Sequence, residues 1–62
     1  MPLIIIEGPE SDTETKEKLI KEVTNVVANA YKLPNSAIDI VIHESHPDNV
    51  GVGGEQLSKL RK

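Results

Sequence analysis

Apolar positions divide the chain into two short strand-like segments with a long helix-like segment between them. Residues 3–6 are all apolar, and Gly8 and Pro9 form a turn signal directly after them. A short apolar run with such an end predicts a strand buried on both faces. In residues 38–44 the apolar side chains alternate, which predicts a second strand with one wholly apolar face. The apolar face carries Ile38, Ile40 and Ile42, and the opposite face carries Asp39, Val41 and His43.

Residues 12–32 show helical periodicity. Ser11, followed three residues later by Glu14, has the spacing of a capping box, so we expect Ser11 to cap a helix. Pro34 disfavours helix in the residue before it and predicts the end. A strand, a helix and a strand in this order form a βαβ unit with parallel strands and a right-handed crossover. One stripe of the helix carries its apolar side chains: Leu19, Ile20, Val23, Val26, Val27, Ala30 and Tyr31.

The remaining residues differ in character from this unit. Residues 46–49 predict a turn, and the glycines of residues 50–54 predict a hairpin or a bulge. We therefore expect an α/β (α+β) fold. Two strands under one helix leave one sheet face uncovered, and such a unit is not stable alone. The uncovered face is expected to meet another copy in a closed symmetric assembly.

Composition narrows the class of protein. The chain has 62 residues, which predicts one domain spanning residues 1–62, and it buries only about 60% of its unfolded surface. It has no cysteine, which excludes disulfides and thiolate metal sites and fits a reducing cytoplasm. Two histidines without a supporting cluster are weak grounds for a metal, so we expect no metal and no cofactor.

Charge and hydropathy exclude further classes of partner. The net charge of −3 and the single aromatic residue, Tyr31, argue against nucleic-acid binding. No apolar run has the length to cross a bilayer, and the N-terminal stretch lacks the basic region of a secretory signal. We expect a soluble cytoplasmic protein whose partners are small molecules or copies of itself.

Pro2 is the strongest candidate for chemistry. It follows the initiator methionine directly, and removal of Met1 would leave an N-terminal secondary amine. In its neutral form this amine can serve as a general base or as a nucleophile toward carbonyls. The plain alternative is a proline that begins a strand, where it needs no ladder donor. The motif alone favours this plain alternative.

Taken together, these features resemble the 4-oxalocrotonate tautomerase family over nearly the whole chain. The resemblance implies a β-α-β unit with a small C-terminal hairpin, assembled into homohexamers as trimers of dimers. It also implies that Pro2 is the base that moves a proton on an enol, beside a hydrophobic wall contributed partly by the glycine-rich tail. The residues that carry it are Pro2, residues 3–6, Glu7-Gly8, Lys16, Leu19-Ile20, Glu22-Val23, residues 38–44 and residues 50–55.

The chain departs from this family at three positions. The family has an arginine in the loop after the first strand, whereas residues 8–11 contain no cation. Asp39 stands at the position of a second arginine, and Val50 replaces an aromatic residue. Asp39 would repel a dicarboxylate and disfavour the neutral form of a nearby amine, so activity on the family's usual dicarboxylate is doubtful.

Four residues are candidates for substrate binding: His43, Val50, Arg61 and Asp39. His43 could polarise a carbonyl or relay a proton, and a place in a subunit interface is at least as consistent with its pattern. Arg61 is either a solvated tail charge, which we favour, or a replacement cation for a neighbouring subunit's site. Lys16 is expected at the surface of the helix or facing the first loop.

Three hypotheses for function follow. The first is a tautomerase with Pro2 as general base, acting on a 2-hydroxydienoate or a phenyl-enolpyruvate-like acid. The second is a hydratase, dehalogenase or decarboxylase that uses the same proline. The third is a self-assembling scaffold or binding protein that retains the fold.

Overall fold

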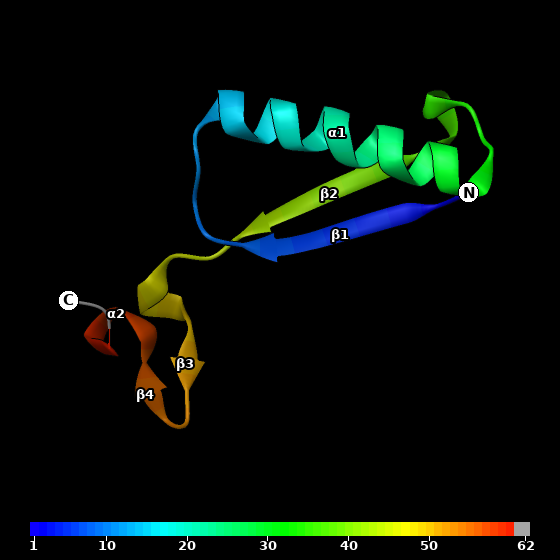
Figure 1. Ribbon diagram of the computed structural model, residues 1–62. Helices are drawn as coiled ribbons and strands as arrows, with labels where there is room; N and C mark the ends of the chain where they lie inside the picture. Colours follow the sequence, from blue (N-terminus) through cyan, green and yellow to red (C-terminus); the bar gives the residue numbers. More distant parts are fainter. Residues whose placement is uncertain (61–62) are drawn as a thin grey trace.

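The strands and helices follow the predicted order. In the computed structural model, which describes residues 1–60, β1 and β2 are parallel neighbours and α1 connects them (Figure 1). A β-α-β unit with parallel strands and a C-terminal hairpin is therefore confirmed. The elements are β1 (Leu3–Gly8), α1 (Thr13–Tyr31), η1 (Asn35–Ala37), β2 (Asp39–Glu44), η2 (Pro47–Asn49), β3 (Gly51–Val52), β4 (Glu55–Gln56) and α2 (Leu57–Leu60).

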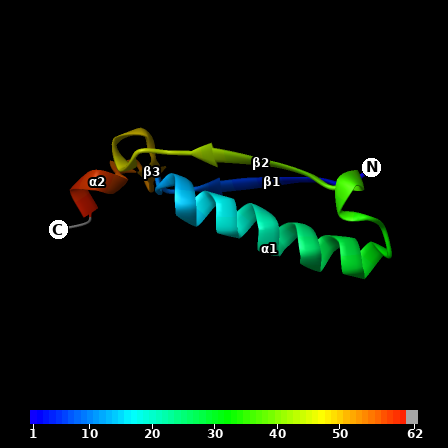
Figure 2. The same ribbon diagram turned by 90° about the horizontal axis from the view of Figure 1, so that it is seen from above.

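The two faces of the β1–β2 sheet differ in exposure. Ile4 pairs with Ile40 and Ile6 pairs with Ile42, and all four residues are half-buried. Helix α1 runs along one face of the sheet (Figure 2), which accounts for their burial. The opposite face, called the open face below, is exposed. Ile5 on this face is 55% exposed, so burial of β1 on both faces is wrong for a single chain. The open face consists of Leu3, Ile5, Glu7, Asp39, Val41 and His43.

The helix is capped one residue later than expected. Asp12, not Ser11, is the N-cap, and its Oδ1 accepts a hydrogen bond from the Thr15 backbone N–H at 2.7 Å. The Ser11 N–H instead donates to Glu44 Oε2 at 2.9 Å. Aspartate is as good a cap as serine, so the capping-box prediction for Ser11 is wrong by one residue. At the other end, Lys32 adopts a left-handed conformation (φ 59°) and closes the helix before Pro34.

The sheet covers a narrower stripe of α1 than the sequence predicts. Val23 and Val27 are half-buried, and Ala28, which was not in the predicted stripe, is the buried residue of the helix. Val26 and Tyr31, which were in it, are each about two-thirds exposed. Two strands are too few to cover the whole apolar surface of a 19-residue helix. The apolar side chains of α1 that the sheet does not cover are therefore available for contact with another protein surface.

A tight hairpin follows the second strand. In it Gly51 pairs with Gln56 and Val52 pairs with Glu55. Gly53 (φ 61°) and Gly54 (φ 86°) form its two-residue loop, and consecutive positive φ angles are those of a type I′ turn. The predicted hairpin is confirmed. It projects beyond the carboxyl ends of β1 and β2 (Figure 1).

A single chain is more extended and more exposed than a compact monomeric domain of its length. Its radius of gyration is 15.0 Å, whereas a compact chain of this length has about 11 Å. Its accessible surface is 4977 Å², about 1,000 Å² more than expected for its mass. Among residues 1–60 only Ala28 and Ile38 are buried apolar residues. The excess resembles the roughly 800 Å² that one partner contributes to a standard interface.

Within residues 1–60, no helix is both long enough and apolar enough to cross a membrane.

Candidate functional site

Pro2 lies immediately before β1, at the amino end of the sheet. Its carbonyl oxygen accepts a hydrogen bond from the Asp39 backbone N–H at 3.0 Å, which fixes it to the head of β2. Pro2 itself is half-buried, whereas Met1 is 95% exposed. An aminopeptidase therefore has access to Met1, and the nitrogen that trimming would free is held in a defined position by the sheet.

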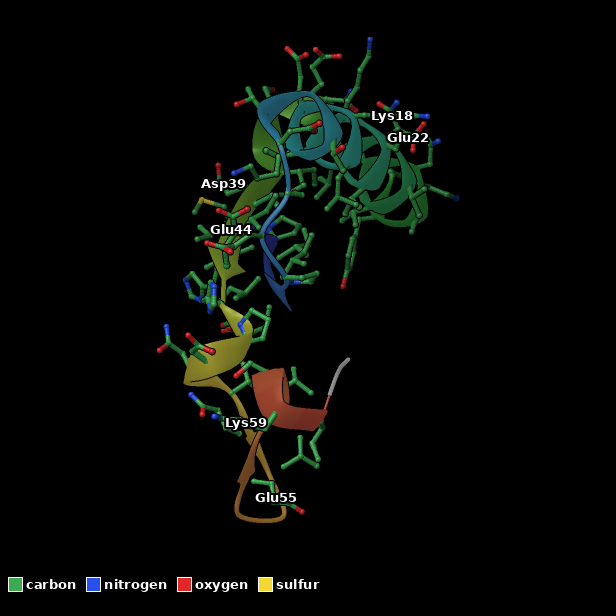
Figure 3. The ribbon with its side chains drawn as sticks, turned by 90° about the vertical axis from the view of Figure 1, so that its left-hand side faces the viewer. Lys18, Glu22, Asp39, Glu44, Glu55 and Lys59 are labelled. Atoms are coloured by element: carbon green, nitrogen blue, oxygen red, sulfur yellow. The ribbon has the colours of Figure 1, made fainter. Side chains whose placement is uncertain are left out.

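Asp39 brings a negative charge to the same end of the sheet. It pairs in register with Leu3, and its side chain is exposed on the open face (Figure 3). Among residues 1–60 no cation lies within ion-pair distance of its carboxylate. Asp39 is therefore placed beside Pro2, as its position in the sequence predicts. A carboxylate there favours the protonated form of a nearby amine.

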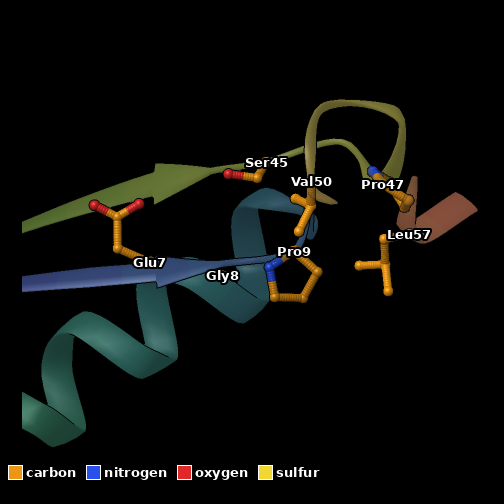
Figure 4. A pocket seen from close by; sticks show the side chains of 7 residues that line it. All are labelled: Glu7, Gly8, Pro9, Ser45, Pro47, Val50 and Leu57. Atoms are coloured by element: carbon orange, nitrogen blue, oxygen red, sulfur yellow. The ribbon is translucent and has the colours of Figure 1, made fainter. Parts of the chain in front are cut away.

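An apolar hollow of about 350 Å³ lies at the opposite end of the sheet, beside the carboxyl ends of β1 and β2 (Figure 4). Val50, a predicted binding residue, is part of its wall. The volume lies within the range of small-ligand pockets. The carboxyl end of parallel strands is also where open α/β sheets bind ligands. The hollow, here called the hairpin hollow, is lined by Glu7, Gly8, Pro9, Ser45, Pro47, Val50 and Leu57.

His43 and Glu7 form a pair at the same end. They are register partners across β1 and β2, and His43 Nδ1 lies 2.8 Å from Glu7 Oε2. The side chains are 52% and 68% exposed, respectively. In the neutral imidazole an Nδ1–H that donates to the carboxylate leaves Nε2 as an acceptor. The pair therefore presents an oriented ring nitrogen on the open face, next to the hairpin hollow.

Glu44 joins the first loop to the second strand. Its carboxylate accepts the Ser11 N–H and contacts Lys16 Nζ at 3.0 Å. The Ser11 backbone hydrogen bond, and after it the Lys16 side chain, hold the pKa of Glu44 below its usual value. Lys16 thus faces the loop, one of its two expected positions, and is engaged in an ion pair. This contact fixes the loop that supplies Pro9 to the hairpin hollow.

The second histidine has a local role. His46 Nδ1 accepts the Asp48 backbone N–H at 3.1 Å and caps η2, the turn that carries Pro47 into the hairpin hollow. In the part of the chain that the structure describes, no group of three His, Cys, Asp or Glu side chains is arranged to hold a metal ion. Arg61, a candidate cation, lies outside the described residues.

The candidate residues form two groups at opposite ends of the sheet. Pro2 and Asp39 lie at the amino ends of β1 and β2, the end marked N in Figure 1, whereas His43 and Val50 lie at the carboxyl ends. From Asp39 to His43 there are four residue steps, or about 13 Å along a strand. One chain therefore does not bring Pro2 to the wall that contains Val50.

Sequence reasoning left the role of Glu7 open and missed the apolar walls supplied by Pro9, Pro47 and Leu57. The pairing of Glu7 with His43 was predictable in principle from the sequence, because both residues lie near the carboxyl end of a strand and on the same face of the sheet. The walls depend on how the hairpin folds back, and no sequence pattern gives that.

Comparisons with known proteins give the family. A family model described as tautomerase enzyme matches residues 2–60. The 2-hydroxymuconate tautomerase of Pseudomonas sp. strain CF600 is 38% identical over 60 residues, covering 97% of this chain and 92% of its own. The structure of DmpI from Archaeoglobus fulgidus is similar with a TM-score of 0.83 and 40% identity, covering 92% of this chain and 98% of its own.

A heterohexamer 4-oxalocrotonate tautomerase from Chloroflexus aurantiacus is similar with a TM-score of 0.80 and 28% identity, over 98% of both chains. The sequence relatives, the family model and the solved structures agree over nearly the full length of the chain. The chain therefore belongs to the 4-oxalocrotonate tautomerase family of isomerases.

Proposed function

We propose that the protein interconverts the enol and keto forms of a small acid, with the Pro2 nitrogen as the general base. The observation that carries this proposal is the position of Pro2. It is half-buried, it is hydrogen-bonded to β2 through the Asp39 N–H, and it directly follows Met1, which is exposed. Once Met1 is removed, the amine takes a proton from carbon in the direction of enolisation. Its conjugate acid returns the proton in the direction of ketonisation.

The charge near Pro2 favours one class of substrate. The curated relative is named for 2-hydroxymuconate, a substrate that belongs to that protein. Here the exposed Asp39 lies beside Pro2, so a second carboxylate on the substrate would meet negative charge at this end. We therefore favour an enol with one carboxylate, such as a 2-hydroxydienoate or a phenyl-enolpyruvate-like acid.

A second copy of the chain completes the proposed site. Pro2 and the hairpin hollow lie at opposite ends of one sheet, and the chain alone has an uncovered open face. Since hexameric assembly is described for one structural neighbour, we propose a homohexamer, a trimer of dimers. In it the hairpin hollow of one copy, with Val50, forms the apolar wall beside Pro2 of another. The absence of cysteine fits a cytoplasmic location.

The direct test replaces Pro2 by alanine and follows ketonisation of several enol monoacids by ultraviolet absorbance. Loss of a positioned proton carrier is expected to lower kcat/KM by about 10²- to 10⁴-fold. A control change, Glu22→Ala, lies at an exposed position in the middle of α1 and is expected to keep the activity. Wild-type rates for Pro2→Ala on all these enols would contradict the proposal.

A second function is favoured by one observation. The Asp39 carboxylate beside Pro2 forms no ion pair within residues 1–60 and favours a protonated amine, which suits acid catalysis in a hydratase, dehalogenase or decarboxylase of the same superfamily. Titration of the Pro2 nitrogen by ¹⁵N NMR separates the two functions. A nitrogen that titrates near neutrality, so that both its neutral and its protonated form are present at pH 7, supports tautomerisation. A nitrogen that stays fully protonated well above neutral pH supports the alternative. Membership of an isomerase family disfavours the third hypothesis, a non-enzymatic scaffold.

A further inference from the structure

We propose that His43, oriented by Glu7, is a second proton-transfer residue and acts on the substrate oxygen while Pro2 of another copy acts on carbon. This inference rests on the proposed function. It starts from the 2.8 Å contact between His43 Nδ1 and Glu7 Oε2. An imidazole held at Nδ1 by a carboxylate presents Nε2 in a fixed direction, which is the arrangement that positions a general base.

The location of the pair supports a role in a site. Glu7 lines the hairpin hollow, whose other walls include the apolar side chains of Pro9, Val50 and Leu57. An apolar cavity with few polar groups at its edge is the usual form of a small-molecule site. The pair is the polar group at this edge. Ser45 is the other lining residue with a polar side chain, and it carries no charge.

Distance decides which Pro2 can work with this pair. Within one chain the separation of Pro2 and His43 exceeds the four residue steps from Asp39 to His43, which span about 13 Å. A substrate with one enol and one carboxylate is shorter than this. His43 therefore shares a substrate only with Pro2 of a different copy. In the proposed assembly, this is the copy whose Pro2 lies beside Val50.

The proton balance of the proposed step is closed. In ketonisation the enol O–H bond breaks and its proton passes to His43 Nε2. The electron pair left on oxygen forms the C=O bond, and the electron pair of the C=C bond takes a proton from the protonated Pro2 amine. The reaction leaves an imidazolium and a neutral amine. A proton then returns from the imidazolium to the amine through water, so no further reactant is required.

The charged groups around His43 are compatible with this role. Glu7 on β1 is its hydrogen-bond partner, and Asp39 lies four residues away along the same face of β2 with Val41 between them. The described part of the chain places no lysine or arginine in an ion pair with either Glu7 or His43. Glu7 is thus a positioning residue, and His43 is the residue that meets the substrate.

The first test removes only Nε2. In His43→Asn the side-chain amide still donates to Glu7 from the place of Nδ1, while the acceptor at Nε2 is lost. We expect kcat for ketonisation to fall by about 10²-fold. The control is His46→Asn, in which the amide oxygen still accepts the Asp48 N–H, and its activity should match that of the wild type. Unchanged kcat in His43→Asn would overturn the inference.

The second test examines Glu7 as a positioning residue. Glu7→Gln should lower kcat by roughly tenfold, because the imidazole loses the carboxylate that orients it, and should have no further effect when it is added to His43→Asn. The matched control is Glu22→Gln, at an exposed position on α1 whose side chain points away from the sheet (Figure 3). A further fall of the same size when Glu7→Gln is added to His43→Asn would indicate a merely structural role and would contradict the inference for Glu7.

The third test uses mixed assemblies. Pro2→Ala chains retain His43, and His43→Asn chains retain Pro2. Equal amounts that are unfolded and refolded together should place both intact residues in about one quarter of the sites of a closed assembly. Recovery of about that fraction of wild-type activity is expected. Activity equal to the mean of the separate variants would contradict a site shared between copies.

The proposed function and this inference fail differently. If Pro2→Ala keeps wild-type ketonisation, the proposed function fails. If Pro2→Ala abolishes ketonisation and His43→Asn retains it, the proposed function stands and the inference alone is wrong.

Discussion

Replacement of Ile5 by aspartate tests whether the open face is an interface between copies. Ile5 is the central apolar residue of this face and is 55% exposed in a single chain. Full burial of an isoleucine side chain contributes about 1.5–3 kcal/mol. Covering the exposed half in an assembly therefore contributes roughly 0.8–1.7 kcal/mol for each copy. A contact between two copies would lose about 2–3 kcal/mol, or 30- to 150-fold in the dissociation constant.

The charge of the new aspartate destabilises the contact more than the loss of the apolar side chain does. A carboxylate buried in the contact without a partner costs several kcal/mol more, so we expect Ile5→Asp to be dissociated at micromolar concentration. Sedimentation velocity measures the mass, and far-ultraviolet circular dichroism measures the helix content. Because a single chain buries only two apolar residues among those described, dissociation should also lower the helix content and abolish ketonisation.

The control places the same charge elsewhere. Thr13→Asp lies at the exposed N-terminus of α1, where the helix dipole tolerates a carboxylate. It should retain the mass and activity of the wild type. If Ile5→Asp also retains both, the open face is not an interface, and the reasoning from exposed area is refuted.

Two further predictions concern stability. Gly54→Val forces a β-branched residue into φ +86° and should destabilise the hairpin by about 1–2 kcal/mol, which amide exchange in β3 and β4 would detect as faster rates. Gly8→Ala, with open space around its new Cβ, should leave these rates unchanged. Equal exchange rates in both variants would contradict the turn assignment. Glu44 has a lowered pKa in the folded chain, so its stabilising contribution is present above its ordinary value of 4.5 and is lost as the pH falls through the folded pKa. The Tm of the wild type should therefore fall more steeply below pH 4.5 than the Tm of Glu44→Gln. Superimposable profiles of Tm against pH would show that the contact of Glu44 with Ser11 and Lys16 contributes nothing to stability.

Local sequence patterns were sufficient for the two longer strands and the long helix, but they did not predict η1 or α2. The alternation of residues 38–44 and the three-to-four spacing along α1 are direct consequences of strand and helix geometry, and both elements formed where they were expected. The glycines of residues 50–54 predicted a hairpin or a bulge, and the chain forms the hairpin because Gly53 and Gly54 adopt its turn without strain. The helix cap was misplaced because Ser11 and Asp12 are equally good caps, and the choice depends on Glu44, which is 33 residues away from Ser11.

The site was less accessible to sequence reasoning. Pro2, Asp39, His43 and Val50 were each identified from residue type and position. Their division between two ends of the sheet follows from the parallel register, which only the folded chain fixes. The breadth of the apolar stripe on α1 was overestimated for a related reason. Side chains such as Val26 carry the pattern of a buried face, although a single chain leaves them exposed.

The free nitrogen of Pro2 is the centre of this account, and removal of Met1 tests it most directly. Protein that retains Met1, verified by intact mass, should be assembled but inactive in ketonisation, because the Pro2 nitrogen is then an amide. Treatment of the same sample with methionine aminopeptidase should produce activity in proportion to the fraction of trimmed chains. Full activity before trimming, with Met1 present on every chain, would contradict the account.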